Sequence, residues 1–470
     1  MRHFSSGLPT KTRCHSEGRV CPRNLLCLCI PRHSRSLASL GMTLARFVQR
    51  HGRSFATVFL LLFLTSSCSV AQQKAVPTPK TKIRAITAFV RIERGSYQIQ
   101  MDEAVKFLKI AKTTFESRDF TVQTLRIATQ PFPEYTQGMS HDEAMQFFKN
   151  LDSVAQTENM ILSIGPAYLS GQDGDAQAEL LVDILKNTKS IDASVYVTND
   201  AGVNWPAVRA AAGAMKKLSD GTLHSEGNFR FAALANVPQG SPFFPAAYLT
   251  GMGHQFAVGL ESAGDVAAAV KDAPDLATAQ RRLIDMFFQR ASDVEQMALR
   301  VDRERSWIYL GLDLSPAPGK DASIGTAIEN ISKQPFGASG TLTAVGVITS
   351  ALKQIGLRRT GYSGLMLPIL EDPVLADRWN AGLVSIDALL SYSAVCGTGL
   401  DTVPLPGDAT VDQIARIIGD VATLSIKWNK PLSARLLPIA GRLAGQQTDF
   451  ADPSLLNGVI QPLSGPEPRP

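Results

Sequence analysis

The chain has 470 residues, of which 44% are hydrophobic and 19% are charged, a composition that excludes a disordered protein and is typical of a globular one. Its formal net charge is +5, yet residues 1–71 hold ten of the 47 basic side chains and only one of the 42 acidic ones. The remaining 37 basic and 41 acidic side chains give a net charge of −4, which argues against a nucleic-acid partner.

The leader contains two unlike stretches. Residues 42–71 join a basic segment to an apolar run of about a dozen residues, which is the pattern of a signal peptide. Two processing routes stay open, lipid attachment at Cys68 in an imperfect lipobox and ordinary cleavage after Ala71. The pattern predicts an exported protein of the bacterial cell envelope, either periplasmic or lipid-anchored at a membrane surface.

Residues 1–41 show no sustained periodicity and resemble a translated stretch upstream of the true start. We therefore expect the protein to begin at Met42, with a genuine cytoplasmic extension as the alternative. Cys396 is the only one of six cysteines that lies beyond the leader, which excludes an internal disulfide and a cysteine-based zinc site. The three histidines beyond the leader are dispersed, so the sequence predicts no metal site, and it specifies no cofactor.

Residues 72–81 form a polar linker that contains proline, and beyond it β-branched runs alternate with helical patterns. The helix predicted at Met101–Arg118 carries Ala104, Leu108, Ala111 and Phe115 on one face. Strands are predicted at Lys82–Ile92, Phe120–Ala128, Asn159–Ile164, Ala193–Thr198, Phe229–Val237, His254–Glu261, Trp307–Leu314, Gly361–Leu370 and Ala434–Pro438. Further helices are predicted at Ser140–Ala155, Asp175–Asn187, Pro206–Leu218, Leu276–Arg305, Ser323–Ile331, Thr341–Ile355, Val374–Ala381, Ser385–Ser393 and Val411–Ile426, with Ala394–Pro406 unassigned.

This alternation predicts a single α/β domain over residues 82–465, with helices covering the sheet. Polar residues gather in glycine- and proline-rich stretches next to predicted strands, where α/β proteins usually bind ligands. The candidate catalytic residues are Cys396, Asp313, Glu371 and Asp401, because a thiol can act as a nucleophile and carboxylates can transfer protons. The candidate ligand-binding residues are Arg126, Ser315, Ser323 and Arg435. The structural alternatives are a buried small hydrophobe for Cys396 and helix capping for the acids and serines.

Several long phrases of the sequence carry a resemblance to a known family. They are RIATQPFPEY, ALANVPQGSPFFPAAY, LGLDLSPAPGKDASIG, GYSGLMLPILED, SAVCGTGLDTVPLPGD and KPLSARLLP. They resemble the domain of unknown function 711 family, also called uncharacterised protein family 0210. The resemblance implies a fold like that of pyruvate formate-lyase, an α/β barrel of about ten strands surrounded by helices.

The radical enzymes of that fold pair a cysteine on a loop inside the barrel with a glycine near the C-terminus. By this resemblance Cys396 stands where the cysteine is expected, but Gly441 and Gly458 lack the sequence context of the radical glycine. Radical chemistry is therefore not predicted. We expect an enzyme that acts on a small, acidic organic molecule in a barrel pocket. The alternative is a non-catalytic envelope protein that binds such a molecule, and either protein could form a homo-oligomer.

Overall fold

The computed structural model describes residues 82–168, 174–319 and 321–463. The predicted signal peptide, Cys68 and the linker therefore lie outside the described residues. Within the described part of the chain, no helix combines the length and the apolar character needed to cross a membrane.

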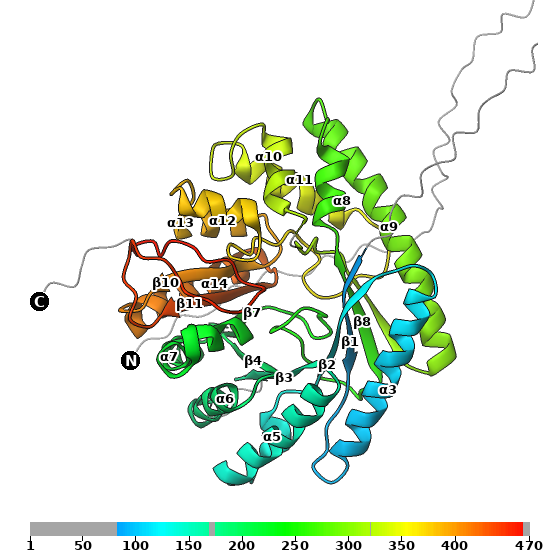
Figure 1. Ribbon diagram of the computed structural model, residues 1–470, viewed down its shortest axis with the longest axis vertical. Helices are drawn as coiled ribbons and strands as arrows, with labels where there is room; N and C mark the ends of the chain where they lie inside the picture. The colour runs from blue at the N-terminus through cyan, green and yellow to red at the C-terminus, as the bar shows by residue number, and fades with distance from the viewer. Residues whose placement is uncertain (1–81, 169–173, 320, 464–470) are drawn as a thin grey trace, which may run out of the picture. The chain divides into compact units, whose positions relative to one another are not determined.

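The described residues form an alternation of strands and helices, as the sequence predicts (Figure 1). The strands of the main sheet are β1 (Lys82–Phe89), β2 (Val122–Ala128), β3 (Ile161–Ala167), β4 (Ile191–Tyr196), β7 (Phe231–Ala235), β8 (Gln255–Glu261), β9 (Ile308–Asp313), β10 (Gly399–Pro406) and β11 (Leu432–Ile439). A small hairpin consists of β5 (Thr198–Asn199) and β6 (Gly202–Val203). The helices are α3 (Tyr97–Glu116), α4 (Pro133–Thr136), α5 (His141–Thr157), α6 (Asp175–Asn187), α7 (Trp205–Gly221), the 3-10 helix η1 (Leu223–Arg230), α8 (Ala263–Val270), α9 (Leu276–Arg305), α10 (Ile324–Ser332), α11 (Thr341–Lys353), α12 (Pro373–Asn380), α13 (Ile386–Ser393) and α14 (Val411–Trp428).

The main sheet has nine strands in the order β10-β11-β7-β4-β3-β2-β1-β8-β9. Neighbours are parallel except at two junctions, where β8 runs antiparallel to β1 and β11 runs antiparallel to β7. Strands β1, β2, β3, β4 and β7 thus point one way, and β8, β9, β10 and β11 point the other way. The predicted α/β class is confirmed as a large, mostly parallel sheet with helices.

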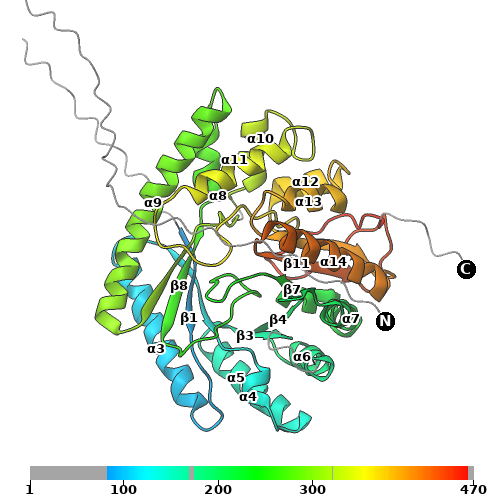
Figure 2. The ribbon, with the colours of Figure 1, turned by 180° about the vertical axis from the view of Figure 1, so that it is seen from behind.

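The helices follow one another around the outside of the strands in both views (Figures 1 and 2). Helix α3 shows why they adopt this position, because its predicted apolar stripe of Ala104, Leu108, Ala111 and Phe115 is fully buried. Burial of each large apolar side chain contributes about 1.5–3 kcal/mol, so the stripe fixes the helix against the strands. The face of the sheet toward the helices is therefore occupied by apolar packing.

In the second half of the chain one predicted strand is wrong and one strand was not predicted. Residues 361–370, predicted as a strand, make one isolated bridge, between Pro368 and Asp401, and a second bridge joins Arg359, just before them, to Leu312. The carboxylate of Asp313 accepts hydrogen bonds from the backbone N–H groups of Tyr362 and Ser363, so these donors do not join a strand ladder. Conversely β10 lies in a segment left unassigned.

Candidate functional site

A cavity of about 320 Å³ borders the sheet, and polar side chains of several strands line it. Side chains two residues apart on one strand share a face, which is why Thr124 and Arg126 of β2 both line it. Ser433 and Arg435 of β11 line it for the same reason, across the antiparallel junction with β7. The end of η1 contributes Phe229 and Arg230 to the wall, and loops contribute Phe243, Phe244, Tyr362, Met366 and Glu371.

Arg435 joins two carboxylates on one side of this cavity, which we call the arginine pocket. Its Nε donates to Oδ1 of Asp401 at 2.6 Å and its Nη2 donates to Oε1 of Glu371 at 2.5 Å. The guanidinium carbon also lies 4.9 Å from the centre of the Phe229 ring, a cation–π contact. Burial favours the uncharged form of Arg435, but Asp401 and Glu371 together outweigh this effect and raise its pKa.

The same buried environment acts on Glu371. Burial raises the pKa of Glu371, and the nearby charge of Asp401 adds to this effect while Arg435 opposes it. A carboxylate with a raised pKa accepts a proton more readily than an ordinary one does. Glu371 is thus the better candidate of the pair for proton transfer.

Arg126 is a second buried guanidinium in the arginine pocket, and it has far fewer partners. Its side chain donates from Nε to Oγ1 of Thr124 at 3.1 Å and stacks at 5.0 Å over the ring of Phe244. No described carboxylate lies within ion-pairing distance, 4.0 Å, of its nitrogens. Burial lowers the pKa of Arg126 to about 10, so it remains charged at neutral pH. Its terminal nitrogens are available to a ligand.

Asp192 lies at the start of β4 and lines the pocket with an exposed fraction of only 7%. Burial raises its pKa to about 7, although the positive charges of Arg230, Arg126 and Arg435 oppose the shift. Arg230 is itself committed to the backbone, because it donates to the carbonyl oxygens of Ile191 and Leu185. Asp192 is therefore a carboxyl group that can change protonation state near neutral pH.

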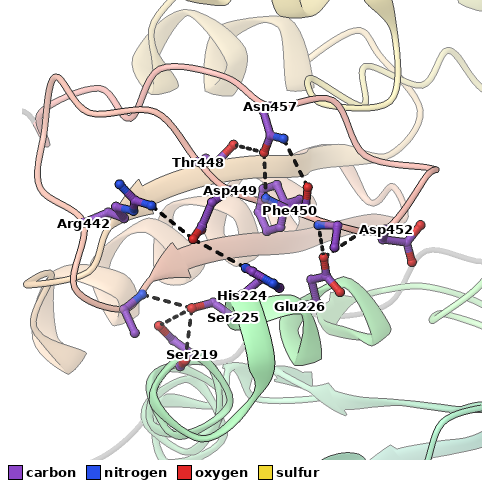
Figure 3. A network of polar contacts seen from close by, with 12 residues as sticks. Ser219, His224, Ser225, Glu226, Arg442, Thr448, Asp449, Phe450, Asp452 and Asn457 are labelled. Atoms are coloured by element: carbon purple, nitrogen blue, oxygen red, sulfur yellow. Dashed lines mark hydrogen bonds and ion pairs between the residues drawn. The ribbon is translucent and has the colours of Figure 1, made fainter.

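The C-terminal loop, residues 440–461, supplies Asp452 and Ser454 to the wall of the pocket. Glu226 fixes this loop, because its carboxylate accepts from the backbone N–H groups of Ala451 at 2.5 Å and Asp452 at 2.8 Å. Figure 3 shows the adjoining contacts, in which Asp449 lies between Arg442 and His224. The loop is thus attached to η1, whose last residues also line the pocket.

The backbone of η1 is bent where it makes these contacts. His224 and Ser225 have φ values of 51° and 59°, two successive left-handed residues that are not glycine. Ser225 accepts from the backbone N–H of Ala440 at 3.0 Å and donates to the carbonyl of Ser219. Such residues are unfavourable in isolation and persist where their contacts compensate, as they do here.

The structure brings four of the predicted site residues together and separates the others. Glu371, Asp401, Arg126 and Arg435 all line the arginine pocket. Asp313 and Ser315 are completely buried beside it in a hydrogen-bonded turn, where Asp313 accepts from Ser315, Tyr362 and Ser363. Their role there is to shape the loop that carries Tyr362 into the pocket wall.

Ser323 and Cys396 lie elsewhere. Ser323 caps α10 by accepting from the N–H of Thr326, and it donates to the carboxylate of Asp372. Cys396 is 1% exposed within the main apolar core and lines neither the arginine pocket nor three further cavities among the described residues. The position of this thiol matches that of a small buried hydrophobe.

Sequence reasoning missed Asp192 because the strand was predicted to begin one residue later, at Ala193. A signal was present, since Asp192, Ser194 and Tyr196 alternate with Ala193 and Val195. This alternation indicates a strand with one polar face. Among the described residues, no three His, Cys, Asp or Glu side chains cluster so as to hold a metal ion.

The chain is similar to proteins from distant organisms. The family described as Uncharacterised ACR (DUF711) matches residues 74–454. A UPF0210 protein of Pyrobaculum islandicum is 31% identical over 397 residues, which cover 80% of this chain and 87% of that protein. UPF0210 proteins of Neisseria meningitidis and Methanocaldococcus jannaschii are 26% and 24% identical, covering 69% and 76% of this chain and 75% and 83% of their own lengths.

The distribution of these relatives corrects the predicted location. Pyrobaculum and Methanocaldococcus are archaea, and another relative occurs in Oenococcus oeni, a Gram-positive bacterium without a periplasm. The domain thus occurs in cells that lack the predicted compartment. The prediction of an exported envelope protein, periplasmic or lipid-anchored, is wrong.

Proposed function

The chain belongs to the DUF711 family, and from the geometry of its arginine pocket we propose that it is an enzyme that binds a small organic anion and transfers a proton on it. The observation that carries the proposal is the buried guanidinium of Arg126. A buried charge without a partner is costly, and guanidinium groups bind carboxylates and phosphates through two parallel hydrogen bonds. The ligand supplies the missing anion.

Glu371 is the proposed proton-transfer residue. It lies on the wall of the same cavity, its carboxylate accepts from Arg435, and burial raises its pKa, which makes it a better proton acceptor. In the proposed step the ionised carboxylate takes a proton from the ligand and returns it later. Arg435 and Asp401 act as positioning residues that hold Glu371 in place.

The alternative is a protein that binds the anion without turnover. The contact between Arg435 and both carboxylates favours this alternative, because an acid engaged in an ion pair is a weaker proton acceptor. The two candidates share the pocket and differ only in the chemistry of Glu371.

For the fold, we propose that the sheet closes into a barrel of about ten strands, like that of pyruvate formate-lyase. Two isolated bridges support this proposal, since Arg359 pairs with Leu312 of β9 and Pro368 pairs with Asp401 of β10. Residues 359–370, which contain both bridging residues, would then stand in for the tenth strand. The two groups of parallel strands, which point in opposite directions, are compatible with such a closure.

Binding is tested by thermal shift with small carboxylates and phosphates, using the wild type and Arg126→Met. We expect a carboxylate or phosphate that raises the melting temperature of the wild type and has no effect on Arg126→Met. Arg209→Met is the matched control, because Arg209 forms an exposed ion pair with Asp412 on the surface. An equal shift in wild type and Arg126→Met would disprove the anion site.

Turnover is tested by incubating the bound compound with the protein in D₂O and following its C–H signals by NMR. Proton transfer by Glu371 predicts loss of one C–H signal with the wild type, and its persistence with Glu371→Gln. A ligand that binds but exchanges no proton and yields no product would establish the non-catalytic alternative.

A further inference from the structure

Two opposite charges line the arginine pocket without contacting each other. Neither the guanidinium of Arg126 nor the carboxylate of Asp192 has an ion-pair partner within 4.0 Å among the described residues. Both side chains are more than nine-tenths buried, with exposed fractions of 8% and 7%. Asp192 accepts no hydrogen bond from any described residue, and its carboxylate borders the cavity.

The three other arginines that line the cavity are already engaged. Arg435 is shared by Glu371 and Asp401, and Arg230 donates to two backbone carbonyls. Arg84 reaches Glu261 and donates to Gln123. Of the buried charges that line this pocket, Arg126 and Asp192 are thus the two left for a ligand.

A ligand with one charge would satisfy only one of these groups. An anion alone would leave Asp192 without a partner, and a cation alone would leave Arg126 without one. Burial of an unpaired charge is unfavourable, so a molecule that carries both charges gains from both contacts. The cavity of about 320 Å³ is within the size range of pockets for small organic ligands.

We infer that the ligand is a zwitterion of the amino-acid class, with its carboxylate on Arg126 and its ammonium group on Asp192. This inference rests on the proposed function, since it names the substrate class of the same pocket. Asp192 acts here as a binding residue, and Glu371 keeps the role of proton transfer.

Proton release on binding is a readout specific to this contact. Arg230, Arg126 and Arg435 face Asp192, yet its pKa stays near 7 in the free protein. An ammonium group placed against the carboxylate would lower that pKa, so a fraction of a proton leaves Asp192 on binding at pH 7. Calorimetry in buffers of different ionisation enthalpy measures this proton directly.

The experiment compares three matched sets of compounds by calorimetry at pH 7. Each set holds an amino acid, its hydroxy acid and its des-amino acid: L-alanine, L-lactate and propionate; L-glutamate, L-2-hydroxyglutarate and glutarate; L-phenylalanine, L-phenyllactate and 3-phenylpropionate. We expect the amino acid of at least one set to bind at least about tenfold more tightly than its two analogues, with proton release.

The near-isosteric variant Asp192→Asn should lose this preference and the proton release, while it still binds the des-amino acid. The matched control is Asp272→Asn, which changes an exposed acid and should bind like the wild type. Equal binding of all three members of a set, abolished by Arg126→Met, would overturn the inference and leave the proposed function intact. Absence of binding by all nine compounds would overturn both the inference and the proposed function. Binding that is unchanged in Arg126→Met and in Asp192→Asn would also overturn both.

Discussion

The carboxyl group of Asp192 should make the stability of the protein depend on pH. Its pKa is raised from 3.8 to about 7 in the folded protein, so the folded state holds a proton that the unfolded state releases. The contribution of Asp192 to the free energy of unfolding is therefore fully present below about pH 4. It is lost as the pH rises through 7, a loss of at most about 4 kcal/mol.

Asp192→Asn removes this dependence. We expect the melting temperature of the variant, relative to that of the wild type, to increase between pH 4 and pH 8 in the absence of ligand. Differential scanning calorimetry across that range measures the effect. If the melting temperatures of the two proteins change in parallel with pH, Asp192 does not titrate in this way.

Arg435 holds the two acids on the other side of the pocket. Arg435→Met leaves Glu371 and Asp401 buried without their cation, so we expect a loss of about 3 kcal/mol in the free energy of unfolding. The double variant Arg435→Met with Glu371→Gln should recover part of the loss. Arg209→Met, in the exposed pair with Asp412, should cost less than about 1 kcal/mol. Urea unfolding measures both losses. Equal losses in the free energy of unfolding for Arg435→Met and Arg209→Met would show that the buried ion pairs stabilise the fold no more than the exposed one.

At the scale of elements, Asp372 links two helices that are distant in the sequence. Its carboxylate accepts from the N–H groups of Val374 and Leu375 at the start of α12, and from Ile324 at the start of α10. We expect Asp372→Ala to reduce the free energy of unfolding by about 2–4 kcal/mol, because buried donors lose their acceptor.

Asp275 provides the comparison, since it caps α9 alone and at the surface by accepting from Thr278. Asp275→Ala should cost about 1 kcal/mol. Chemical denaturation of both variants measures the difference. A cost for Asp372→Ala no greater than that for Asp275→Ala would mean that the second helix gains nothing from the shared cap.

Long elements could be predicted from the sequence, because their patterns are local. The helix predicted from Ser140 and the apolar stripe of α3 each need only one stretch of chain, and both predictions are confirmed. The strand predicted at 361–370 is absent because Asp313, about fifty residues earlier, takes the backbone donors. Periodicity contains no information about such a contact.

The pocket was partly predictable for the same reason. The sequence places four polar residues in or beside predicted strands, which made them candidates to line a pocket: Arg126, Glu371, Asp401 and Arg435. The sequence does not show that Arg435 reaches Glu371, since 64 residues separate them. Nor does it show that Arg126 and Asp192 lack partners, because that depends on every neighbour across the sheet.

At the scale of the whole molecule, the segment 361–370 meets the chain before β10 through two glycines. A Cβ atom on Gly364 would lie 2.5 Å from the backbone of Gly397, and a Cβ atom on Gly397 would lie 2.4 Å from that of Gly364. Gly364→Ala should therefore separate the two segments and cost about 1–3 kcal/mol.

Gly213 is the matched control, because it lies within α7 and a Cβ atom there meets no described atom within 4 Å. Gly213→Ala should raise the melting temperature slightly, since alanine favours the helix. If Gly364→Ala is also neutral or stabilising, the close approach of the two backbones is not needed for the fold.

The position of β11 between β7 and β10 has a consequence for synthesis on the ribosome. Strand β7 is complete after residue 235, but its neighbour β11 is made about two hundred residues later. During that interval the open edge of β7 can pair with other nascent chains. We expect chaperone dependence and aggregation during translation to depend on how quickly the last strand arrives, rather than on the stability of the finished protein.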